Sequence, residues 1–468
     1  MGSDAFSTLS DVADVIDSLH KTPKYSEFGY PMVRCVNISY GPLNLSETKL
    51  VTEEIFKEYS KKYTPQSGDI IITRVGANFG ETTYVEDTNF CLGQNTAAIK
   101  PKAINSDYLY FMLNSAHCKH QMDVLAAGAA QPTLSIKSIK SIKIPRLGDE
   151  SEQNIAYIIG GLNNKITLNR QINQTLEQMA QALFKSWFVD FDPVVDNALD
   201  AGFFAQDLDL PDELLRRAEA RQAVRKQSDF KPLPDATRQL FPAVFEECAE
   251  PSLGLGGWVP KGWKTKMLGD ITSELRRGIS PKYIEDGGVK VINQKCIRNH
   301  ELSYEAARRH DQETKAINGR SLQLGDVLVN STGVGTLGRI AQVTYLDETT
   351  VADSHVTVVR VKEDIFPIYT FGQLMLSMES NIERLGEGST GQTELSRKIL
   401  SEQLVVLPPS IIAEHVNKSF KSFAEKQVSN RKQNSELTKL RDTLLPKLIS
   451  GELRLDNIKV ELVTDAVN

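Results

Sequence analysis

Apolar and polar positions follow two kinds of spacing along this chain, and each kind occurs twice. Short apolar runs rich in β-branched residues, such as 69–75 and 326–329, are bounded by Gly and Asn, which is typical of strands. Longer stretches carry apolar residues at steps of three and four, which is typical of amphipathic helices; one shorter example is 107–125. The pattern predicts an α+β protein with two mixed α/β domains, each followed by a long helix.

The first long helical pattern covers 155–187. Asp149, with Glu152 three residues later, resembles a capping box at its start, and the Asp-Pro pair at Pro193 predicts its end. At about 1.5 Å per residue, a helix of this kind would be on the order of 50 Å long.

The second long pattern covers 416–448, with Gly451 as a predicted C-cap and Pro446 expected to kink or loosen the last turns. Each helix alone would leave an apolar stripe exposed to water. We therefore expect the two to pair as an antiparallel coiled coil. That pairing predicts a pseudo-two-fold arrangement, with the helix pair separating the two domains.

The domains themselves are a repeat. Residues 9–188 recur as 268–449, shifted by roughly 257–263 positions. Gly68-Asp69-Ile70-Ile71-Ile72 returns as Gly325-Asp326-Val327-Leu328-Val329, and Pro23-Lys24-Tyr25 returns as Pro281-Lys282-Tyr283. Most side chains between these landmarks differ. Two similar scaffolds with different surfaces indicate one molecule that makes two related but distinct recognitions.

Charge is distributed unevenly along the 468 residues, whose formal net charge is −6. Residues 189–260 hold 7 Lys and Arg against 14 Asp and Glu, so the rest of the chain is close to neutral. This acidic connector is predicted to be structured in places, with a short helix at 212–226 between proline breakers. A neutral pair of domains permits a local basic face.

The composition is that of an ordinary globular protein, with 40% hydrophobic and 24% charged residues. No apolar run approaches the roughly 20 residues needed to cross a bilayer, and no secretory signal is visible at the N-terminus. The five cysteines are odd in number and scattered, which favours reduced thiols and a cytoplasmic location.

Three motifs suggest chemistry but are weak. Residues 333–338 match the dinucleotide pattern G-x-G-x-x-G, yet 339–345 looks like a strand where that fingerprint needs a helix, so a turn between strands is favoured. His117-Cys118-Lys119-His120 offers too few ligands for a metal, and a helix surface is the simpler interpretation. Asp353-Ser354-His355 contains triad residue types at adjacent positions that do not by themselves form a triad.

The sequence also lacks a Gly-x-x-x-x-Gly-Lys-Ser/Thr phosphate loop, an Asn/Asp-Pro-Pro-aromatic methyltransferase signature and a nuclease-like carboxylate pair. We therefore expect no catalysis by this chain alone, and no metal or cofactor bound to it.

Polar and basic residues gather instead in matched loops of the two repeats. Arg, Lys, Asn and Gln are the residues that read base edges and bind phosphates, although they are also common on any solvated surface. Recurrence at matched positions with changed identity favours DNA contact. The predicted contacts are Lys21, Thr22, Lys24, Arg74, Asn78, Gln94, Asn95, Gln131, Thr133 and Lys137 in the first repeat, and Ser280, Lys282, Asn330, Ser331, Thr332, Arg339, His355, Gln392 and Thr393 in the second.

The whole layout resembles the specificity subunit of type I restriction–modification enzymes. Local marks support the resemblance: 169–172 with 183–193 resembles the family's central conserved stretch, 444–453 its C-terminal one, and Pro260-Lys261-Gly262-Trp263 the entry to a recognition domain. The first repeat departs from the family pattern because it lacks that Pro-x-Gly-Trp entry.

The resemblance implies target recognition domains at 1–148 and 258–408, conserved long helices at 149–190 and 409–452, an acidic connector at 191–257 and a tail at 453–468. Each domain would read one half of a bipartite, asymmetric site on double-stranded DNA, with the helix pair setting the gap.

The resemblance also implies partners. Two modification (methyltransferase) subunits would dock on the helices, and restriction subunits with an ATP-dependent translocase and nuclease would follow. S-adenosylmethionine, ATP and Mg would then reside on those partner subunits. The expected docking residues are Leu176, Met179, Leu183, Trp187, Leu437, Leu440, Leu444 and Leu448.

Two alternatives from other classes stay open at the level of sequence. One is a non-catalytic coiled-coil scaffold that binds proteins and no DNA. The other is a nucleotide-dependent enzyme that uses residues 333–338.

Overall fold

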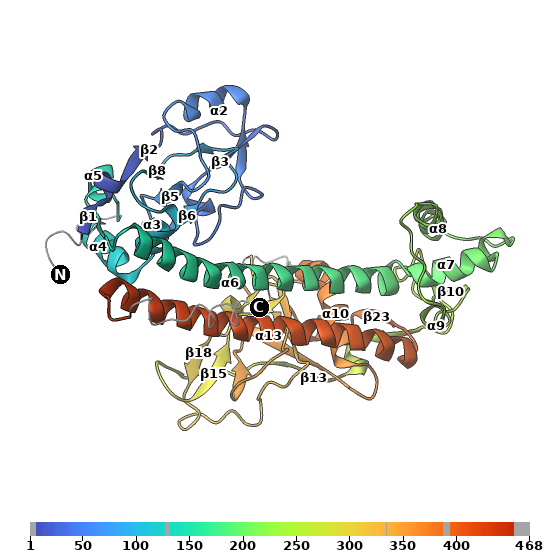
Figure 1. Cartoon of the computed structure of the whole chain (residues 1–468). Helices are drawn as coiled ribbons and strands as arrows, with labels where there is room; N and C mark the ends of the chain where they lie inside the picture. The colour runs from blue at the N-terminus through green and yellow to red at the C-terminus, as the bar shows by residue number, and fades with distance from the viewer. Residues whose placement is uncertain (1–5, 127–131, 334, 387–393, 454–468) are drawn as a thin grey trace. The chain divides into compact units, whose positions relative to one another are not determined.

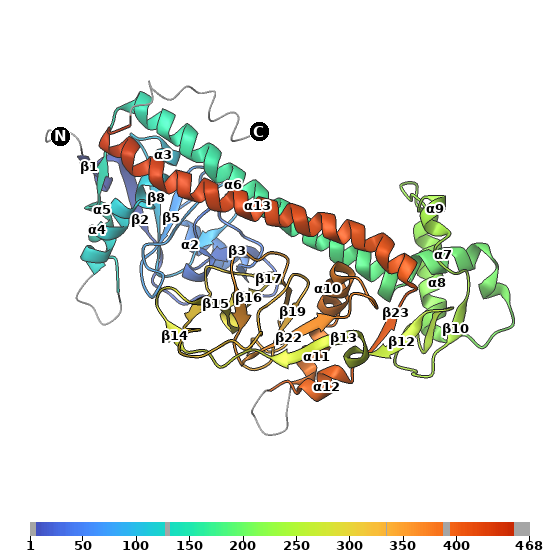
Figure 2. The same ribbon diagram turned by 90° about the horizontal axis from the view of Figure 1, so that it is seen from below.

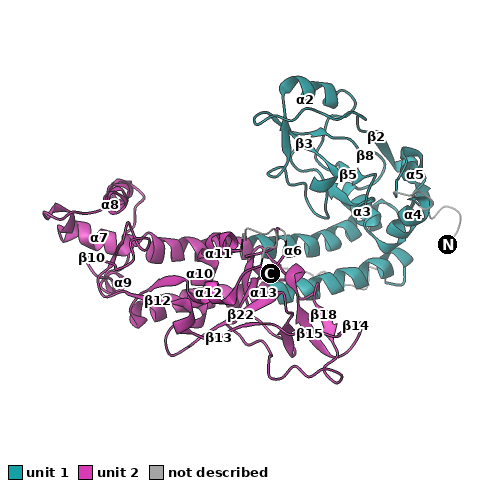
Figure 3. Cartoon of the chain, turned by 180° about the vertical axis from the view of Figure 1, so that it is seen from behind, with its two compact units in different colours: residues 1–171, 431–468 teal, residues 172–430 magenta. Residues whose placement is uncertain are grey.

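The structure is a computed structural model that describes residues 6–126, 132–333, 335–386 and 394–453. The chain divides into two units, residues 1–171 with 431–468 and residues 172–430, coloured separately in Figure 3. None of the helices in the described ranges is long and apolar enough to cross a membrane. All five cysteines lie in these ranges as free thiols.

The first unit is built on an antiparallel sheet in the order β2 (Ala13–Asp17), β8 (Thr96–Pro101), β5 (Ile70–Thr73) and β6 (Thr82–Tyr84). The three isoleucines of β5 are fully buried. Ile70 and Ile72 join one hydrophobic cluster and Ile71 joins another, because successive side chains point to opposite faces of a strand. Both faces of this sheet are therefore covered, which explains why β5 reads as a continuous apolar run.

A second sheet of the first unit has the order β4 (Lys49–Val51), β3 (Tyr30–Val33) and β7 (Cys91–Leu92), with β3 and β7 parallel. The remaining pair is β1 (Phe6–Thr8) with β9 (Lys143–Pro145). The short helices of this domain are α1 (Leu9–Val12), α2 (Glu53–Ser60), α3 (Ser106–Leu113), α4 (Ala116–Ala126) and α5 (Ile136–Lys140).

The single helix expected at 107–125 is wrong, because α3 and α4 are separate helices. The break falls at Asn114 and Ser115. The Asn114 amide donates to the Tyr110 carbonyl (2.8 Å) and to Thr82 Oγ1 (2.6 Å), and the Ser115 hydroxyl donates to the Met112 carbonyl (2.6 Å). Side chains that bond to the backbone in this way compete with the helical hydrogen bonds and end the helix.

The second unit repeats this architecture. Its antiparallel sheet has the order β13 (Thr272–Arg277), β22 (Val356–Val361), β19 (Val327–Asn330) and β20 (Ile340–Gln342). A further sheet has the order β14 (Tyr283–Ile284), β18 (Arg308–His310), β15 (Val289–Ile292) and β21 (Thr350–Ala352), with β15 and β21 parallel. The matching strand orders confirm the repeat seen in the sequence.

The other elements of this domain are β12 (Lys264–Met267), which pairs with β23 (Leu404–Leu407), and the short hairpin β16 (Ile297–Arg298) and β17 (Glu301–Leu302). Three helices cover it, α10 (Ile368–Ser377), α11 (Glu379–Leu385) and α12 (Arg397–Ser401).

Two long helices, α6 (Asp149–Phe184) and α13 (Ser410–Ser450), each run from one unit into the other. Within each unit their segments lie side by side (Figures 1 and 2). In the first unit Asn163 pairs with Arg441 (3.1 Å) and Asn169 with Asn434 (2.9 Å). The residue number on α6 rises from 163 to 169 while the number on α13 falls from 441 to 434, so the pairing is antiparallel, as expected.

The same order holds in the second unit. There the Asn430 amide donates to Asn173 Oδ1 (2.8 Å), and the Gln427 amide donates to the Asn173 carbonyl (3.1 Å). All three residues are buried. Buried amides are satisfied only in the matching alignment, so they hold the helices in register.

The helix α13 continues through Pro446 to Ser450. Gly451 follows it with a φ of 72°, the left-handed conformation expected of a C-cap glycine.

The expected capping box at Asp149 is not formed. The chain turns at Gly148 (φ 84°), which leaves Asp149 as the first helical residue with its side chain 98% exposed. The fully buried Glu152 instead accepts the Leu147 N–H (3.0 Å) and an N–H of Arg146 (2.7 Å). This carboxylate lies in the first turn, where it also interacts favourably with the helix dipole.

The acidic connector is a folded part of the second unit. After a π-helical turn at Lys185–Val189 it forms α7 (Asp192–Asp200), α8 (Asp212–Arg225), α9 (Asp235–Arg238) and β10 (Phe245–Glu247), which pairs with β11 (Trp258–Pro260). The helix expected at 212–226 is therefore confirmed.

Part of the connector's charge is paired within it. Asp192, Asp196 and Asp200 lie on successive turns of α7, and they pair with Arg217, Arg221 and Arg225 of α8. Each pair is 25 residues apart in sequence, so the two helices run parallel. The ladder neutralises the buried carboxylates of Asp192 and Asp196 and ends at the exposed Asp200.

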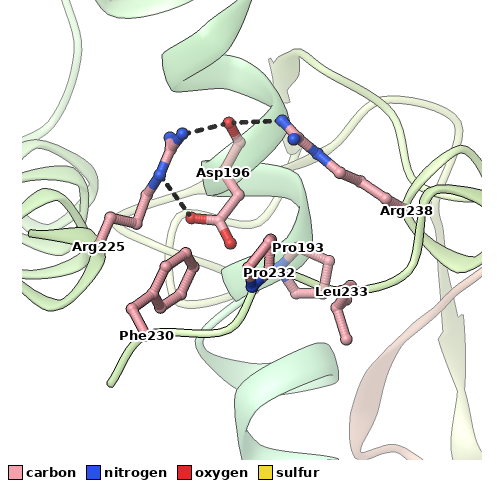
Figure 4. Close-up of a pocket in the computed structure, with 7 residues that line it drawn as sticks. All are labelled: Pro193, Asp196, Arg225, Phe230, Pro232, Leu233 and Arg238. Carbon is pink, nitrogen blue, oxygen red and sulfur yellow. Dashed lines mark hydrogen bonds and ion pairs between the residues drawn. The ribbon is translucent and has the colours of Figure 1, made fainter. Parts of the chain in front are cut away.

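A small pocket lies at this ladder, and Figure 4 draws the seven residues that line it: Pro193, Asp196, Arg225, Phe230, Pro232, Leu233 and Arg238. The Asp196 carbonyl accepts from both Arg225 (3.3 Å) and Arg238 (3.5 Å).

We predict that Gly338→Ala destabilises the chain more than Gly80→Ala does, although the two glycines occupy matched turns. Both have positive φ, 82° and 76°, which costs any other residue about 1–3 kcal/mol. At Gly338 an added Cβ would lie 2.6 Å from backbone Cα of Glu383, whereas at Gly80 it would meet the flexible Met122 Sδ at 3.0 Å. Urea unfolding of both variants measures the difference; equal destabilisation would contradict this account.

Candidate nucleic-acid interface

Three segments of the first unit meet where β5 ends. The Arg74 N–H donates to the Asn95 carbonyl (2.8 Å), and the Leu134 N–H donates to the Arg74 carbonyl (2.8 Å). Val75 forms an isolated bridge with Thr133. Three loops that are distant in sequence, carrying the predicted residues Arg74, Asn95 and Thr133, are therefore one cluster, which we call loop cluster 1.

The second unit builds the same backbone framework where β19 ends. The Ser331 N–H donates to the His355 carbonyl (2.9 Å), and the Leu395 N–H donates to the Ser331 carbonyl (2.8 Å). Thr332 forms the bridge that matches Val75, here with Glu394. We call this loop cluster 2. The frameworks agree bond for bond, while the side chains that they carry differ.

One arginine supports each cluster, but from a different strand. In cluster 1 Arg74 forms an ion pair with Asp17 and donates from Nε to the Leu134 carbonyl (3.1 Å). In cluster 2 the matched position is Ser331, and Arg277 from β13 donates to the Leu395 carbonyl and to Glu394 Oε1, both at 2.9 Å.

Leu134 and Leu395 are equivalent in the repeat, so the two arginines donate to the same backbone carbonyl. They do so from different positions, because Ser331 occupies the position of Arg74 and Asp17 occupies the position of Arg277. Burial lowers the pKa of the Arg277 guanidinium, and Glu394 partly offsets this. Arg277 could not be found from the sequence, because the equivalent position in the first repeat holds Asp17 and not an arginine.

A tyrosine with a cation over its ring lies in each matched Pro-Lys-Tyr loop. Lys49 Nζ lies 4.6 Å and the Arg34 guanidinium 5.7 Å from the Tyr25 ring centroid. The Arg308 guanidinium lies 3.4 Å from the Tyr283 ring centroid. Cation–π contacts of this kind hold a positive charge beside an aromatic face, which suits both phosphate contact and base stacking. The repeated Pro-Lys-Tyr was a signal for the rings, but nothing in the sequence indicated Arg34, Lys49 or Arg308.

The Tyr283 loop is connected to loop cluster 2. The Tyr283 hydroxyl donates to Asp353 Oδ2 (3.4 Å), while Asp353 Oδ1 accepts the backbone N–H of His355 (2.9 Å). The His355 ring contacts Thr332 Oγ1 instead (Nδ1 to Oγ1 2.9 Å). Asp353 therefore orients the loop and not the imidazole, so the residues Asp353-Ser354-His355 form no triad. Burial raises the pKa of the Asp353 carboxyl.

The predicted contact residues fall into four sets by exposure. Exposed are Lys21, Thr22, Lys24, Asn78, Gln94, Thr133, Lys137, Ser280, Lys282 and His355. Half-buried are Arg74, Asn95, Thr332 and Arg339. Buried are Asn330 and Ser331. Outside the described residues lie Gln131, Gln392 and Thr393.

The prediction that Asn330 and Ser331 contact DNA directly is wrong, because both are fully buried. The Ser331 hydroxyl shares a hydrogen bond with Thr357 Oγ1 (2.6 Å), and the Asn330 amide donates to the Gln294 carbonyl (3.2 Å). They lie at the inner base of the cluster, where a strand continues further than the sequence pattern indicated.

Two other motifs take the simpler interpretation. Residues 333–338 connect β19 to β20, so a strand follows where a dinucleotide site needs a helix. Gly333, Gly335 and Gly338 have positive φ, which is what this turn requires of them. His117 and His120 lie on α4, and in the described ranges no group of three or more His, Cys, Asp or Glu side chains is placed to hold a metal ion.

The expected docking residues on the long helices also divide by exposure. Trp187, Leu437 and Leu448 are buried in the hydrophobic cores of this chain, so they stabilise the chain and are not available to a partner. Met179 and Leu440 are 49% and 42% exposed. The half-buried remainder are Leu176, Leu183 and Leu444.

Comparison with known proteins identifies the class. The family model for the type I restriction modification DNA specificity domain matches residues 5–178 and 260–439. The chain therefore belongs to the family of type I restriction–modification specificity subunits, and the two matches correspond to its two target recognition domains. The resemblance noted in the sequence is confirmed, and the DNA-free scaffold has no support among the relatives.

Individual relatives agree. The chain is 27% identical over 410 residues to the type I restriction enzyme HindI specificity subunit of Haemophilus influenzae, covering 83% of this chain and 87% of that protein. It is 23% identical over 421 residues to the MjaIX specificity subunit of Methanocaldococcus jannaschii, covering 87% and 82%. Its fold is similar to the crystal structure of a type I S subunit from M. genitalium, with a TM-score of 0.51, 14% identity and coverage of 96% and 97%.

We predict a coupling free energy of about 1 kcal/mol or more between Arg74 and Asp17 in a double-mutant cycle of unfolding. Their side chains are 11% and 27% exposed, so removing one leaves the other poorly solvated. The matched control is the pair of Lys102 and Asp14, whose side chains are 53% and 54% exposed. Asp14 lies on the same strand as Asp17. Its coupling should be near zero. Equal coupling in the two pairs would mean that Arg74 does not support the loop cluster.

Proposed function

We propose that each recognition domain reads one half of a bipartite, asymmetric DNA site. The observation that carries this proposal is the pair of loop clusters, which share a backbone hydrogen-bond framework and differ in the side chains on it. The exposed Gln94 in one cluster stands against Ser354 in the other, and Asn95 stands against His355. One scaffold with two sets of polar groups is what two readers of different base sequences require.

Contact with DNA would divide between positioning and reading. Exposed cations in the Pro-Lys-Tyr loops, Lys24 and Lys282, are suited to phosphates. Exposed polar groups at the clusters, such as Gln94 and His355, are suited to base edges in a groove. The net charge of −6 does not oppose this, because the excess of acidic residues lies in the connector and the rest of the chain is close to neutral.

The helices α6 and α13 would act as a ruler. Half-sites must face the protein with the right separation and helical phase, so a stiff spacer of fixed length selects the gap. The buried amides of Asn169, Asn173 and Asn430 support this role, because sliding one helix along the other would leave them without partners. A rigid spacer also raises the effective concentration of the second domain once the first is bound.

The chain would select the DNA site, and its partner subunits would catalyse the reactions there. Two methyltransferase subunits would dock on the helix pair in the cytoplasm, and the exposed Met179 and Leu440 are available as apolar contacts. S-adenosylmethionine would be bound by those subunits, and ATP and Mg by the restriction subunits that join them. The modified base would be an adenine in each half-site.

We predict that Lys24→Ala and Lys282→Ala each reduce the slope of log K against log salt by about 0.9 for binding to the specific DNA site, because each removes one phosphate contact. The complex with the methyltransferase subunits is used, with affinity measured by fluorescence anisotropy over a range of salt. Lys226→Ala, an exposed lysine of the connector, is the control and should leave the slope unchanged. Binding that is insensitive to salt would favour a protein-binding scaffold.

Deleting one heptad from α13 alone should abolish methylation, since the remaining amides would face the wrong partners. Deleting seven residues from both helices at paired positions should restore it with a gap shorter by on the order of 3 base pairs, from about 1.5 Å per helical residue and 3.4 Å per base pair. Sequencing of methylated adenines reports both results. An unchanged gap in the double deletion would overturn the ruler.

A further inference from the structure

A short turn in the second unit rests on a helix that belongs to the first repeat. Asn299 and His300 join β16 to β17, and both have positive φ (52° and 61°). The His300 ring lies between two carboxylates, with Nδ1 3.5 Å from Glu177 on α6 and Nε2 3.3 Å from Glu379 on α11. The Gln181 side-chain amide donates to Glu177 Oε1 (2.8 Å) and so orients that carboxylate toward the ring. The ring thus joins the recognition domain to α6.

This contact is ionic. Hydrogen bonds to Glu177 and then to Glu379 raise the pKa of His300 to about 9, so the ring is charged at neutral pH. Burial raises the pKa of the Glu177 carboxyl, but His300 and Gln181 outweigh this and hold the pKa below its ordinary value. Glu379 in turn accepts the backbone N–H of Ile340 (2.9 Å). The charge is therefore held between two rigid elements.

The equivalent turn of the first unit also rests on the helix of the other repeat. It follows Ile38, which matches Ile297, and it presents Tyr40. The Arg441 guanidinium on α13 lies 5.2 Å from the Tyr40 ring centroid, and Arg441 donates to Asn163 Oδ1 on α6 (3.1 Å). The Tyr40 ring also stacks on Tyr110, with the centroids 5.4 Å apart.

The two contacts lie at matched places on the helices. Asn169 and Asn430 are equivalent in the repeat. Gln181 follows Asn169 by 12 residues, and Arg441 follows Asn430 by 11. Each recognition domain therefore touches the far half of the helix that comes from the other repeat. The chemistry differs, with an imidazolium between carboxylates in one unit and a guanidinium on an aromatic ring in the other.

We propose that these turns are latches that position each recognition domain on the helix pair and so determine which gap between half-sites is accepted. The domain 2 latch is His300 with Glu177, Gln181 and Glu379, and the domain 1 latch is Tyr40 with Arg441 and Asn163. His300 and Tyr40 are positioning residues and touch no base. This inference rests on the proposed bipartite reading and adds that the base sequence and the gap are determined by different residues.

The physical reason is that apolar contact has no preferred direction. Each recognition domain shares a hydrophobic core with the long helices, and such a core permits small tilts unless a directional polar contact opposes them. A tilt of a few ångströms at the latch is comparable to the 3.4 Å rise of one base pair per strand. A charged, half-buried contact resists such a tilt through short-range electrostatics, since separating the partners would leave charges poorly solvated.

The test uses the full chain assembled with its methyltransferase subunits, with methylated adenines mapped on a DNA library in which both half-sites are constant and the gap varies. We expect His300→Gln to keep both half-site sequences and to raise methylation at gaps one base pair too long or too short by about tenfold relative to the correct gap. His300→Lys retains the positive charge and should restore selectivity. Tyr40→Ala should relax the gap in the same way through domain 1.

Arg298→Ala, an exposed neighbour in the same hairpin, is the matched control and should leave gap selectivity intact. Loss of selectivity there as well would mean that the hairpin, and not the latch, is responsible. A changed half-site sequence in His300→Gln, or an unchanged gap in both His300→Gln and Tyr40→Ala, would overturn the latch. If the unmodified chain directs no gapped motif at all, the proposed function itself fails, which is a separate result.

A pH profile provides an independent readout. The pKa of His300 is raised in the folded chain, so its contribution to attachment is complete below its ordinary pKa near 6.5 and is lost as the pH rises through about 9. The difference in urea stability between the unmodified chain and His300→Gln should therefore shrink between about pH 6.5 and pH 9. A constant difference over this range would show that the imidazole acts by shape alone and would overturn the ionic latch.

Discussion

The pairing of α6 with α13 is the constraint on which the rest of the chain depends. Each helix exposes an apolar stripe too long for one small domain to cover, so the stripes must cover each other. Apolar side chains alone would tolerate several alignments. The buried amides of Asn169, Asn173 and Asn430 do not, since each finds its partner in one alignment only. The register of the pair is thereby fixed by polar groups in an apolar seam.

The repeat shows how one scaffold can carry two different surfaces. The backbone bonds that join the loops at the end of β5 recur at the end of β19. Because main-chain groups make these bonds, the side chains on the loops are free to differ. The arginine that supports the cluster is the clearest case, since Arg74 and Arg277 reach the same carbonyl from different strands. In both units an arginine binds this carbonyl, while the side chains around it differ.

Much of this was visible in the sequence, where the pattern follows from local physics. Alternation and apolar runs located β5 and β19, the three- and four-residue spacing located both long helices, and the recurrence of short motifs revealed the repeat. The strand after residues 333–338 excluded a nucleotide loop. The family resemblance, too, depended on motifs that lie close together in sequence.

The failures are non-local. Asn330 and Ser331 looked like loop residues, yet partners from Gln294 and Thr357 make them part of the interior. The break at Asn114 depends on Thr82, which lies on another element. Tyr40 and His300 gave no signal, because their significance comes from Arg441 and Glu177, which are remote in sequence. Side chains whose role is set by a distant partner cannot be found from periodicity.

The most direct measurement of the central claim is a genome-wide map of methylated adenine in cells that carry the partner methyltransferase, with and without this chain. The account predicts one asymmetric motif of two short sequences separated by a fixed gap, which disappears when the chain is deleted. Methylation that stays unchanged, with the methyltransferase shown to be active, would contradict the claim that this chain determines which DNA sequence is methylated.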